Sequence, residues 1–267
     1  MHVSVRSDTR AAYDALAPVY DGLTAHHDHE RWLALLLELA SAHGLSGRRV
    51  LDVGCGTGKS FMPLVRRGYR VTACDLSPAM AARARHRARG HAVRVCVADM
   101  RRLPVLCAGA DLVTCLDDAV NYLLEPGDLR AALAGMRRNL RPGGLLVFDV
   151  NTLATYGAVF CDGLTWANGE ETYAAVGEPR AVEQGALYAT TLQAWSGGRL
   201  VAESRHVQRH YGVVEIEQAL RAARLELLGA YGGAADGSPQ RPPDERRHVK
   251  TLVVARRPPE PARGERR

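Results

Sequence analysis

The sequence of 267 residues lacks several features on which other classes of protein depend. Its longest apolar candidate, residues 32–40, is far shorter than the roughly 18 to 20 apolar residues of a membrane-spanning helix. The first ten residues, MHVSVRSDTR, contain no apolar stretch of the kind that a secretory signal carries. We therefore expect a cytoplasmic protein that has no membrane as a partner.

Cysteine pairs at metal-binding spacing are also missing. The six cysteines include no C-x-x-C pair, and four of them lie in or just after predicted strands. Small buried thiols in a reducing compartment explain this distribution better than disulfide bonds or a metal site. The cluster of His26, His27 and His29 has no acid or cysteine nearby at ligand spacing, so we expect solvated histidines and no metal.

A basic face is absent as well, although the formal net charge is +6. From Arg241 onward the chain carries nine basic and four acidic residues, which leaves the rest close to neutral. Positive charge concentrated in a proline- and arginine-rich loop and tail argues against a nucleic-acid groove. We expect no nucleic acid as a partner.

The most informative segment is RRVLDVGCGTGKS, from Arg48 to Ser60. Val50, Leu51 and Val53 predict a buried strand, and the glycines after it predict a turn at which a ligand can approach bare backbone. A strand, a glycine turn and a helix N-terminus together often hold a nucleotide-like ligand at the carboxyl edge of a parallel sheet.

The spacing of this turn excludes two kinds of phosphate binder. A P-loop needs a glycine five positions before its Gly-Lys-Ser, and Val53 stands there. The dinucleotide fingerprint has its third glycine five residues after its first, whereas Gly54, Gly56 and Gly58 are two apart. Asp52, just before the turn, suits a ligand with a cationic amino group, because a carboxylate repels phosphate and pairs with ammonium.

Two further predicted strands end in acids. Residues 70–75 end in Asp75, which comes 21 residues after Gly54, and residues 93–99 end in Asp99. An acid at the first of these positions can accept hydrogen bonds from both hydroxyls of a ribose. The three acids on successive strands would meet at the edge where open α/β sheets bind ligands.

Asp52 and the glycine turn resemble the first motif, D/E-x-G-x-G-x-G, of the class I S-adenosylmethionine-dependent methyltransferases. The resemblance implies S-adenosylmethionine as the cofactor, with Asp75 on its ribose and Asp99 on its adenine. It also implies that Tyr13 and Tyr20 close over the cofactor; the alternative is that they only cover the sheet edge.

Met80 is expected either in the core or as a cover for the adenine. The expected cofactor-binding residues are Tyr13, Tyr20, Asp52, Gly54, Cys55, Gly56, Gly58, Asp75, Leu76, Met80, Asp99, Met100, Leu116 and Asp117.

The segment from Asp117 to Tyr122, DDAVNY, would lie beside the sulfonium and bears on the substrate class. It has neither the Asn/Asp-Pro-Pro-aromatic run of enzymes that methylate exocyclic amines of nucleic-acid bases nor the Pro-Cys nucleophile of those that methylate cytosine carbon. The stretch LDDAVNYL instead resembles bacterial small-molecule methyltransferases, including glycine and amino-sugar N-methylating relatives. Position alone suggests these substrate contacts: Asn121, Tyr122, Asn151 and Trp166.

The expected fold is α/β, a doubly wound, seven-stranded, mostly parallel sheet of the Rossmann-like methyltransferase type. Residues 174–194 and 199–211 alternate like antiparallel strands, which predicts a small antiparallel β lid inserted after the fifth strand. The expected organisation is a helical cap (1–47), a cofactor-binding core (48–151), the lid (152–211), a completion of the core (212–257) and a disordered tail (258–267).

Methyl transfer from a sulfonium is an in-line displacement, so the protein must mainly align donor and acceptor and exclude water. A hydroxyl acceptor needs a positioned base, whereas an amine needs only solvent or a weak base. His206 and His210 share a strand face with Gln208 and are the candidate general bases; the alternative is two surface histidines on the rim of the lid.

The expected function is methylation of nitrogen or oxygen in a small metabolite. The alternatives are a methyltransferase that acts on RNA or protein and a non-catalytic cofactor-binding protein of the same fold. The sequence leaves the oligomeric state open, with a homodimer as one option.

Overall fold

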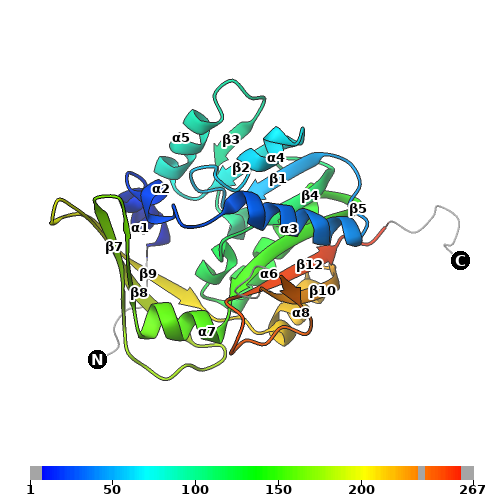
Figure 1. Ribbon diagram of the computed structural model, residues 1–267. Coiled ribbons are helices and arrows are strands. Elements are labelled where there is room, and N and C mark those ends of the chain that lie inside the picture. The colour runs from blue at the N-terminus through cyan, green and yellow to red at the C-terminus, as the bar shows by residue number, and fades with distance from the viewer. Residues whose placement is uncertain (1–7, 234–237, 260–267) are drawn as a thin grey trace, which may run out of the picture.

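The computed structural model has a central sheet with helices on both faces and a second, smaller sheet at one side (Figure 1). The structure describes residues 8–233 and 238–259. Most of the predicted disordered tail, residues 260–267, lies outside the described residues. No helix in the described ranges has both the length and the apolarity that a membrane crossing requires.

Within the described residues, the central sheet has eight strands in the order β11-β10-β12-β5-β4-β1-β2-β3. The strands from β3 to β5 are parallel, and β12 is antiparallel to both β5 and β10. This confirms the predicted mostly parallel sheet, to which the two-residue β11 is an addition. The bounds are β1 Arg49–Val53, β2 Arg70–Asp75, β3 Arg94–Val97, β4 Ala110–Cys115, β5 Leu140–Asn151, β10 Glu226–Gly233, β11 Pro239–Gln240 and β12 Lys250–Arg256.

Helices cover both faces of this sheet because neighbouring residues of a strand point to opposite sides. On β1, Val50 packs with the helices of one layer, and Leu51 packs with those of the other. The first layer contains α3 His29–Ala42, α4 Met62–Arg66 and α5 Pro78–Arg87; the second contains η1 Met100–Arg102, η2 Ala119–Tyr122, α6 Pro126–Asn139 and α8 Val213–Ala222.

The second sheet has the strand order β6-β7-β8-β9 and confirms the expected antiparallel insertion. The predicted unbroken strand over residues 174–194 is wrong, because β7 ends at Gly177 and β8 begins at Leu187. Gly177 lies against the carbonyl of Cys161, and a Cβ there would come within 2.7 Å of that oxygen. The bounds are β6 Leu164–Asn168, β7 Glu171–Gly177, β8 Leu187–Ser196 and β9 Arg199–Arg209.

A helical segment precedes the second sheet and was not predicted. It consists of α7 Leu153–Thr155 and the π-helical η3 Tyr156–Cys161. The rings of Tyr156 and Tyr188 stack at a centroid distance of 4.4 Å, which joins this segment to β8.

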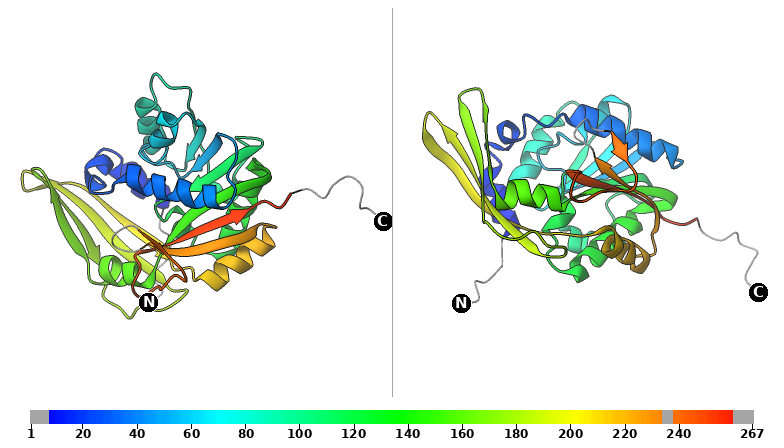
Figure 2. Two further views of the ribbon diagram at one scale, coloured as in Figure 1. Left: turned by 45° about the vertical axis from the view of Figure 1, so that its right-hand side comes forward. Right: turned by 60° about the horizontal axis from the view of Figure 1, so that its bottom comes forward.

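Two N-terminal helices, α1 Thr9–Leu16 and α2 Tyr20–Leu23, stand between the second sheet and the central sheet (Figure 2). Leu16 and Leu23 pack against Tyr173 of β7 and Ala194 of β8. On the other side, Asp14 accepts hydrogen bonds from Ser77 and Ala79 at the start of α5. One part of the second sheet therefore packs on α1 and α2, which in turn contact the start of α5.

Candidate functional site

A pocket of about 400 Å³ opens at the carboxyl ends of β1, β2 and β4. The glycine turn forms its floor, and residues of α1, α2 and η2 form other walls. The sequence-predicted residues that line it are Tyr13, Tyr20, Gly54, Cys55, Gly56, Asp75, Leu76, Asp99, Met100, Leu116, Asp117 and Tyr122.

The glycine turn brings bare backbone to the pocket. Gly54 and Gly56 have φ angles of +73° and +52°, which residues with a side chain rarely adopt. Gly58 does not line the pocket, although we expected it to bind the cofactor. A Cβ at Gly58 would come within 2.7 Å of the Phe61 ring, so this glycine is needed for the packing of the turn.

Asp75 fixes the turn and still offers acceptors to the pocket. One carboxylate oxygen accepts the N–H of Gly56 and the other accepts the N–H of Ser77, both at 2.8 Å. Burial raises the pKa of Asp75, and the backbone hydrogen bonds oppose that rise. Each carboxylate oxygen has a second lone pair, so the side chain can accept two hydroxyls of a ligand.

Asp52 lies beneath the turn rather than on the pocket wall, which corrects its expected contact with a ligand's ammonium group. It is 1% exposed, and its two oxygens accept hydrogen bonds from Ser60 Oγ at 2.8 Å and Thr114 Oγ1 at 2.6 Å. Burial raises the pKa of Asp52 to about 6, against the effect of the two hydroxyl groups. Asp52 therefore ties the turn to β4.

Met80 is fully buried near the start of α5 and does not line the pocket, so the core alternative holds for it. Asp99 does line the pocket, but Arg101 occupies its carboxylate through the backbone N–H at 2.9 Å and the guanidinium at 2.7 Å. Burial acts to raise the pKa of Asp99, and the contacts with Arg101 outweigh it, so that this pKa is lowered.

Three tyrosines line the pocket and meet edge to face. The ring centroid of Tyr13 is 6.1 Å from that of Tyr20 and 5.3 Å from that of Tyr122. Burial raises the pKa of all three phenols, so they are neutral near pH 7. They present aromatic surface and uncharged hydroxyls to a ligand.

His206 and His210 do not line the pocket, and both are buried rather than exposed on a rim. His206 lies behind Tyr122, with 3.0 Å between its Nδ1 and the phenolic oxygen, and burial lowers its pKa to about 4. His210 accepts the N–H of Gly185 at 3.1 Å and lies 3.3 Å from a carboxylate oxygen of Glu245.

Of the four predicted substrate contacts, Tyr122 lines the pocket, and the other three lie away from its wall. Asn121 accepts the N–H of Asn151, whose side chain donates to Gln208 at 2.8 Å, so these residues connect η2, β5 and β9. Trp166 donates to the carbonyl of Leu23 at 3.1 Å. Because α2 lies between the second sheet and the pocket, Trp166 does not reach the pocket wall.

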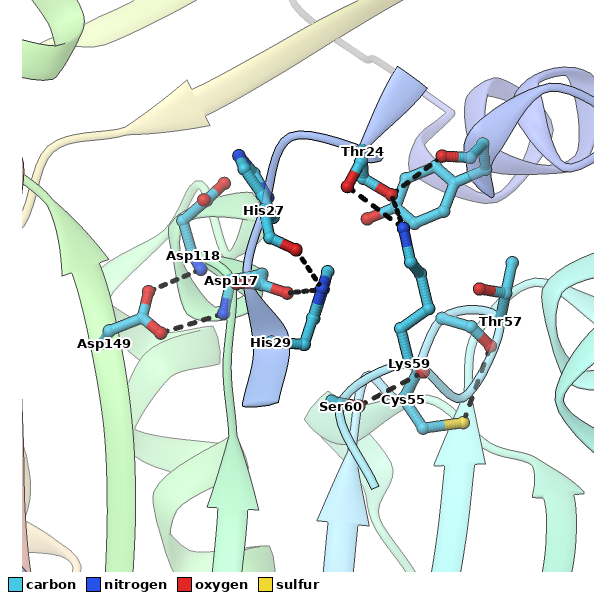
Figure 3. Close-up of polar contacts among 12 residues, drawn as sticks. Thr24, His27, His29, Cys55, Thr57, Lys59, Ser60, Asp117, Asp118 and Asp149 are labelled. Atoms are coloured by element: carbon cyan, nitrogen blue, oxygen red, sulfur yellow. Dashed lines mark hydrogen bonds and ion pairs between the residues drawn. The ribbon is translucent and has the colours of Figure 1, made fainter. Parts of the chain in front are cut away.

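His29 and Lys59 are among the pocket residues that the sequence did not predict. His29 has its Nε2 atom 3.4 Å from a carboxylate oxygen of Asp117, and Lys59 donates to the carbonyl of Thr24 just after α2 (Figure 3). Lys59 also donates to the carbonyl of Asp21. Lys59 belongs to the Gly-Lys-Ser sequence that resembles the end of a P-loop, and this was a weak sign that Lys59 lies at a binding site. No local pattern could signal the His29 contact, because its partner is far away in the sequence.

The loop after β4 is held by a buried carboxylate. Asp149 accepts the N–H groups of Asp117 at 2.8 Å and Asp118 at 2.7 Å, and both of these residues have positive φ angles (Figure 3). Lys250 forms ion pairs with Asp118 and Asp149. Burial raises the pKa of Asp149 to about 6, while the charge of Lys250 acts to lower it.

Known proteins are similar to this chain in sequence and in architecture. Residues 50–144 match a family described as a methyltransferase domain. The cypemycin N-terminal methyltransferase of Streptomyces sp is 30% identical over 228 residues, which cover 84% of this chain and 89% of the relative. A Geobacillus sp. (strain WCH70) protein that is named only as a putative methyltransferase is 33% identical over 162 residues, which cover 60% of this chain and 65% of that relative, just under two thirds.

A similar protein of known structure contains a bound cofactor. CalS10, an amino pentose methyltransferase from Micromonospora echinaspora involved in calicheamicin biosynthesis, is 28% identical and has S-adenosylmethionine bound. The TM-score is 0.67, with 90% of this chain and 96% of that chain covered. The chain belongs to the S-adenosylmethionine-dependent methyltransferases.

The pocket of the methyltransferase fits this cofactor. The free lone pairs of Asp75 suit ribose hydroxyls, and the positive φ angles at Gly54 and Gly56 leave the backbone uncovered. A Cβ at Gly54 would meet Ala119 at 3.0 Å, which would narrow the space between the turn and η2.

We expect Asp75→Asn to weaken binding of S-adenosylhomocysteine by about 10- to 100-fold. An amide must turn its NH₂ group toward the N–H of Gly56 or Ser77, where two donors would meet, and it carries no charge. Isothermal titration measures the affinity. Asp162→Asn, a substitution outside the pocket, is the matched control and should bind like the parent. Equal affinity of Asp75→Asn and the parent would contradict the assignment.

Asp52 predicts a pH-dependent difference in stability. Its folded-state pKa of about 6 lies above the ordinary 3.8. The contribution of Asp52 to the free energy of unfolding is therefore fully present below pH 3.8 and is lost as the pH rises through about 6. An amide in its place cannot ionise. The free energy of unfolding of Asp52→Asn minus that of the parent should therefore be about 1 kcal/mol larger at pH 8 than at pH 5. Urea denaturation at both pH values measures this.

Asp111→Asn is the control for this experiment. Burial acts to raise the pKa of Asp111, but the ion pair with Arg141 and other contacts outweigh it, so that this pKa is lowered. Asp111 is therefore ionised throughout the range, and its difference from the parent should stay constant. A constant difference for Asp52→Asn as well would disprove the raised pKa.

Proposed function

We propose that the methyltransferase transfers a methyl group to the nitrogen of a small-molecule amine. The observation that carries the proposal is the wall of the pocket, where Tyr13, Tyr20 and Tyr122 lie together with the carboxylate of Asp117. Aromatic rings and a carboxylate attract a cationic amine. They offer less to a neutral hydroxyl acceptor.

The arrangement of possible bases supports the same choice. A hydroxyl acceptor needs a strong base in contact with it, whereas an amine reacts once it has lost its proton to solvent. His206 stands behind Tyr122, and His29 on the wall is engaged by the carbonyl of His27 and by Asp117. A volume of about 400 Å³ that must admit the cofactor favours a small acceptor.

Two of the three relatives named above fit an amine acceptor. One is named as a methyltransferase of the cypemycin N-terminus, and the other is described as an amino pentose methyltransferase. These descriptions belong to those proteins, and they support amine methylation here as a proposal.

S-adenosylmethionine, when bound, supplies a methyl group on a positively charged sulfur. The protein's own residues must then orient the acceptor and keep water out. Tyr122 is placed to accept a hydrogen bond from an acceptor N–H while its own hydroxyl contacts His206 Nδ1 at 3.0 Å. Ser204 holds the other ring nitrogen of His206 at 2.8 Å, so the phenol has a fixed direction. His206 thus acts as a positioning residue.

An amine and its hydroxyl counterpart test the proposed reaction directly. We expect a methyl-donor assay over a panel of amine metabolites to give product with at least one amine, and none with the analogue in which OH replaces NH₂. Mass spectrometry of the product locates the methyl group. Transfer to the hydroxyl analogue, or transfer only to RNA or protein, would overturn the proposal.

Tyr122→Phe removes the hydroxyl but keeps the ring. We expect kcat/KM to fall by about 2- to 10-fold, the loss that one uncharged hydrogen bond produces. His206→Ala should cause a similar fall, and the double variant should lose little more, because both changes break the same contact. Steady-state kinetics with the amine identified in the panel measures all three.

The pH profile separates positioning from base catalysis. Burial lowers the pKa of His206 to about 4, so His206 is neutral over the working range. The rate should therefore rise with pH as the acceptor's ammonium group loses its proton, with the same midpoint in the parent and in His206→Ala. A shifted midpoint in His206→Ala would identify the histidine as a base instead.

A further inference from the structure

Three potential metal ligands meet beside the pocket. His27 comes from the segment that joins α2 to α3, His29 is the first residue of α3, and Asp117 comes from the loop after β4. One ligand atom of each lies within 4.8 Å of the others (Figure 3). The expectation of no metal rested on the absence of an acid or cysteine at ligand spacing from these histidines, and folding brings Asp117 to them.

The hydrogen bond of His29 selects the ring nitrogen that is left for a ligand. Nδ1 lies 2.9 Å from the carbonyl oxygen of His27, and a carbonyl can only accept, so Nδ1 carries the proton. In the neutral ring, the lone pair of Nε2 then faces a carboxylate oxygen of Asp117 at 3.4 Å. A proton on Nε2 satisfies this pair of acceptors, and so does a metal ion bound between them.

The spacing suits a tetrahedral ion. With metal–ligand bonds of about 2.0–2.2 Å, neighbouring ligand atoms lie about 3.4 Å apart. The distance between His29 Nε2 and the Asp117 oxygen has this value. His27 is exposed, so its ring can turn to complete the set, and the site is open to solvent.

The supporting contacts hold the other two ligands in place. His29 is the first residue of α3, and its ring is oriented by the His27 carbonyl, the kind of outer contact that orients metal-binding histidines. The N–H of Asp117 donates to Asp149 at 2.8 Å. The nearby positive charge of Lys250 is paired with Asp118 and Asp149.

We propose that His27, His29 and Asp117 bind a divalent transition-metal ion of the zinc type. Two imidazoles and one carboxylate form a set that zinc uses in proteins, with a fourth position for water. Magnesium and calcium prefer oxygen ligands and are disfavoured here. The ion joins the segment before α3 to the loop after β4, and it does so at the wall of the cofactor pocket.

Titration of the full chain, without an added histidine tag, with Co²⁺ tests the site through the visible absorption of the bound ion. We expect one Co²⁺ per chain, displaced by Zn²⁺ and not by Mg²⁺. His27→Ala and His29→Ala should each weaken Co²⁺ binding by at least about tenfold. His26→Ala changes an exposed neighbouring histidine outside the group and should leave the affinity unchanged.

His27→Ala is the decisive variant, because His27 is exposed and outside the cofactor pocket. Its binding of S-adenosylhomocysteine reports whether the fold is kept. Absence of Co²⁺ binding by the parent, equal binding by the parent and His27→Ala, or displacement by Mg²⁺ would each overturn the proposal. Both proposals use Asp117, but only its Oδ2 atom faces His29, so the other oxygen is left for an amine. The titration needs no methyl acceptor, so a failure of the metal site and a failure of the proposed amine methylation are distinguishable.

Discussion

The cofactor site depends on the two hydrogen bonds that the buried carboxylate of Asp52 accepts. This carboxylate accepts the hydroxyls of Ser60 and Thr114, and so joins β1, the end of the glycine turn and β4 below the pocket. Burial of this group opposes its ionisation, and the two hydroxyl groups offset part of that cost. With the turn fixed from below, the N–H of Gly56 meets Asp75 at the pocket wall.

The cofactor half of the site could be predicted because its signals are local. The glycine turn and Asp75 at the end of the next strand are read from short spacings and from apolar runs, and parallel pairing brings them together. Local spacing could not show that Asp52 points beneath the turn. Its direction depends on Ser60 and Thr114, the second of which belongs to another strand.

The predicted substrate contacts and bases depend on contacts between distant segments, and the sequence pattern did not show where their side chains point. Alternation correctly put His206 and Gln208 on one face of β9, but that face meets Tyr122 and Asn151 rather than the pocket. Trp166 is kept from the pocket by α2. The contact of His29 with Asp117 joins the start of α3 to the loop after β4, two segments that share no sequence pattern.

The place of α1 and α2 between the two sheets has a consequence for how acceptor preference can diverge. The strands of the second sheet influence the pocket through intermediaries, such as the contact of His206 with Tyr122. Substitutions in β9 can therefore change the direction of a pocket side chain without adding a new surface to the pocket. Exchange of α1 and α2 between homologous enzymes would instead replace Tyr13 and Tyr20, which form part of the wall itself. A change in α1 or α2 thus alters the pocket wall directly, whereas a change in β9 alters it through another side chain.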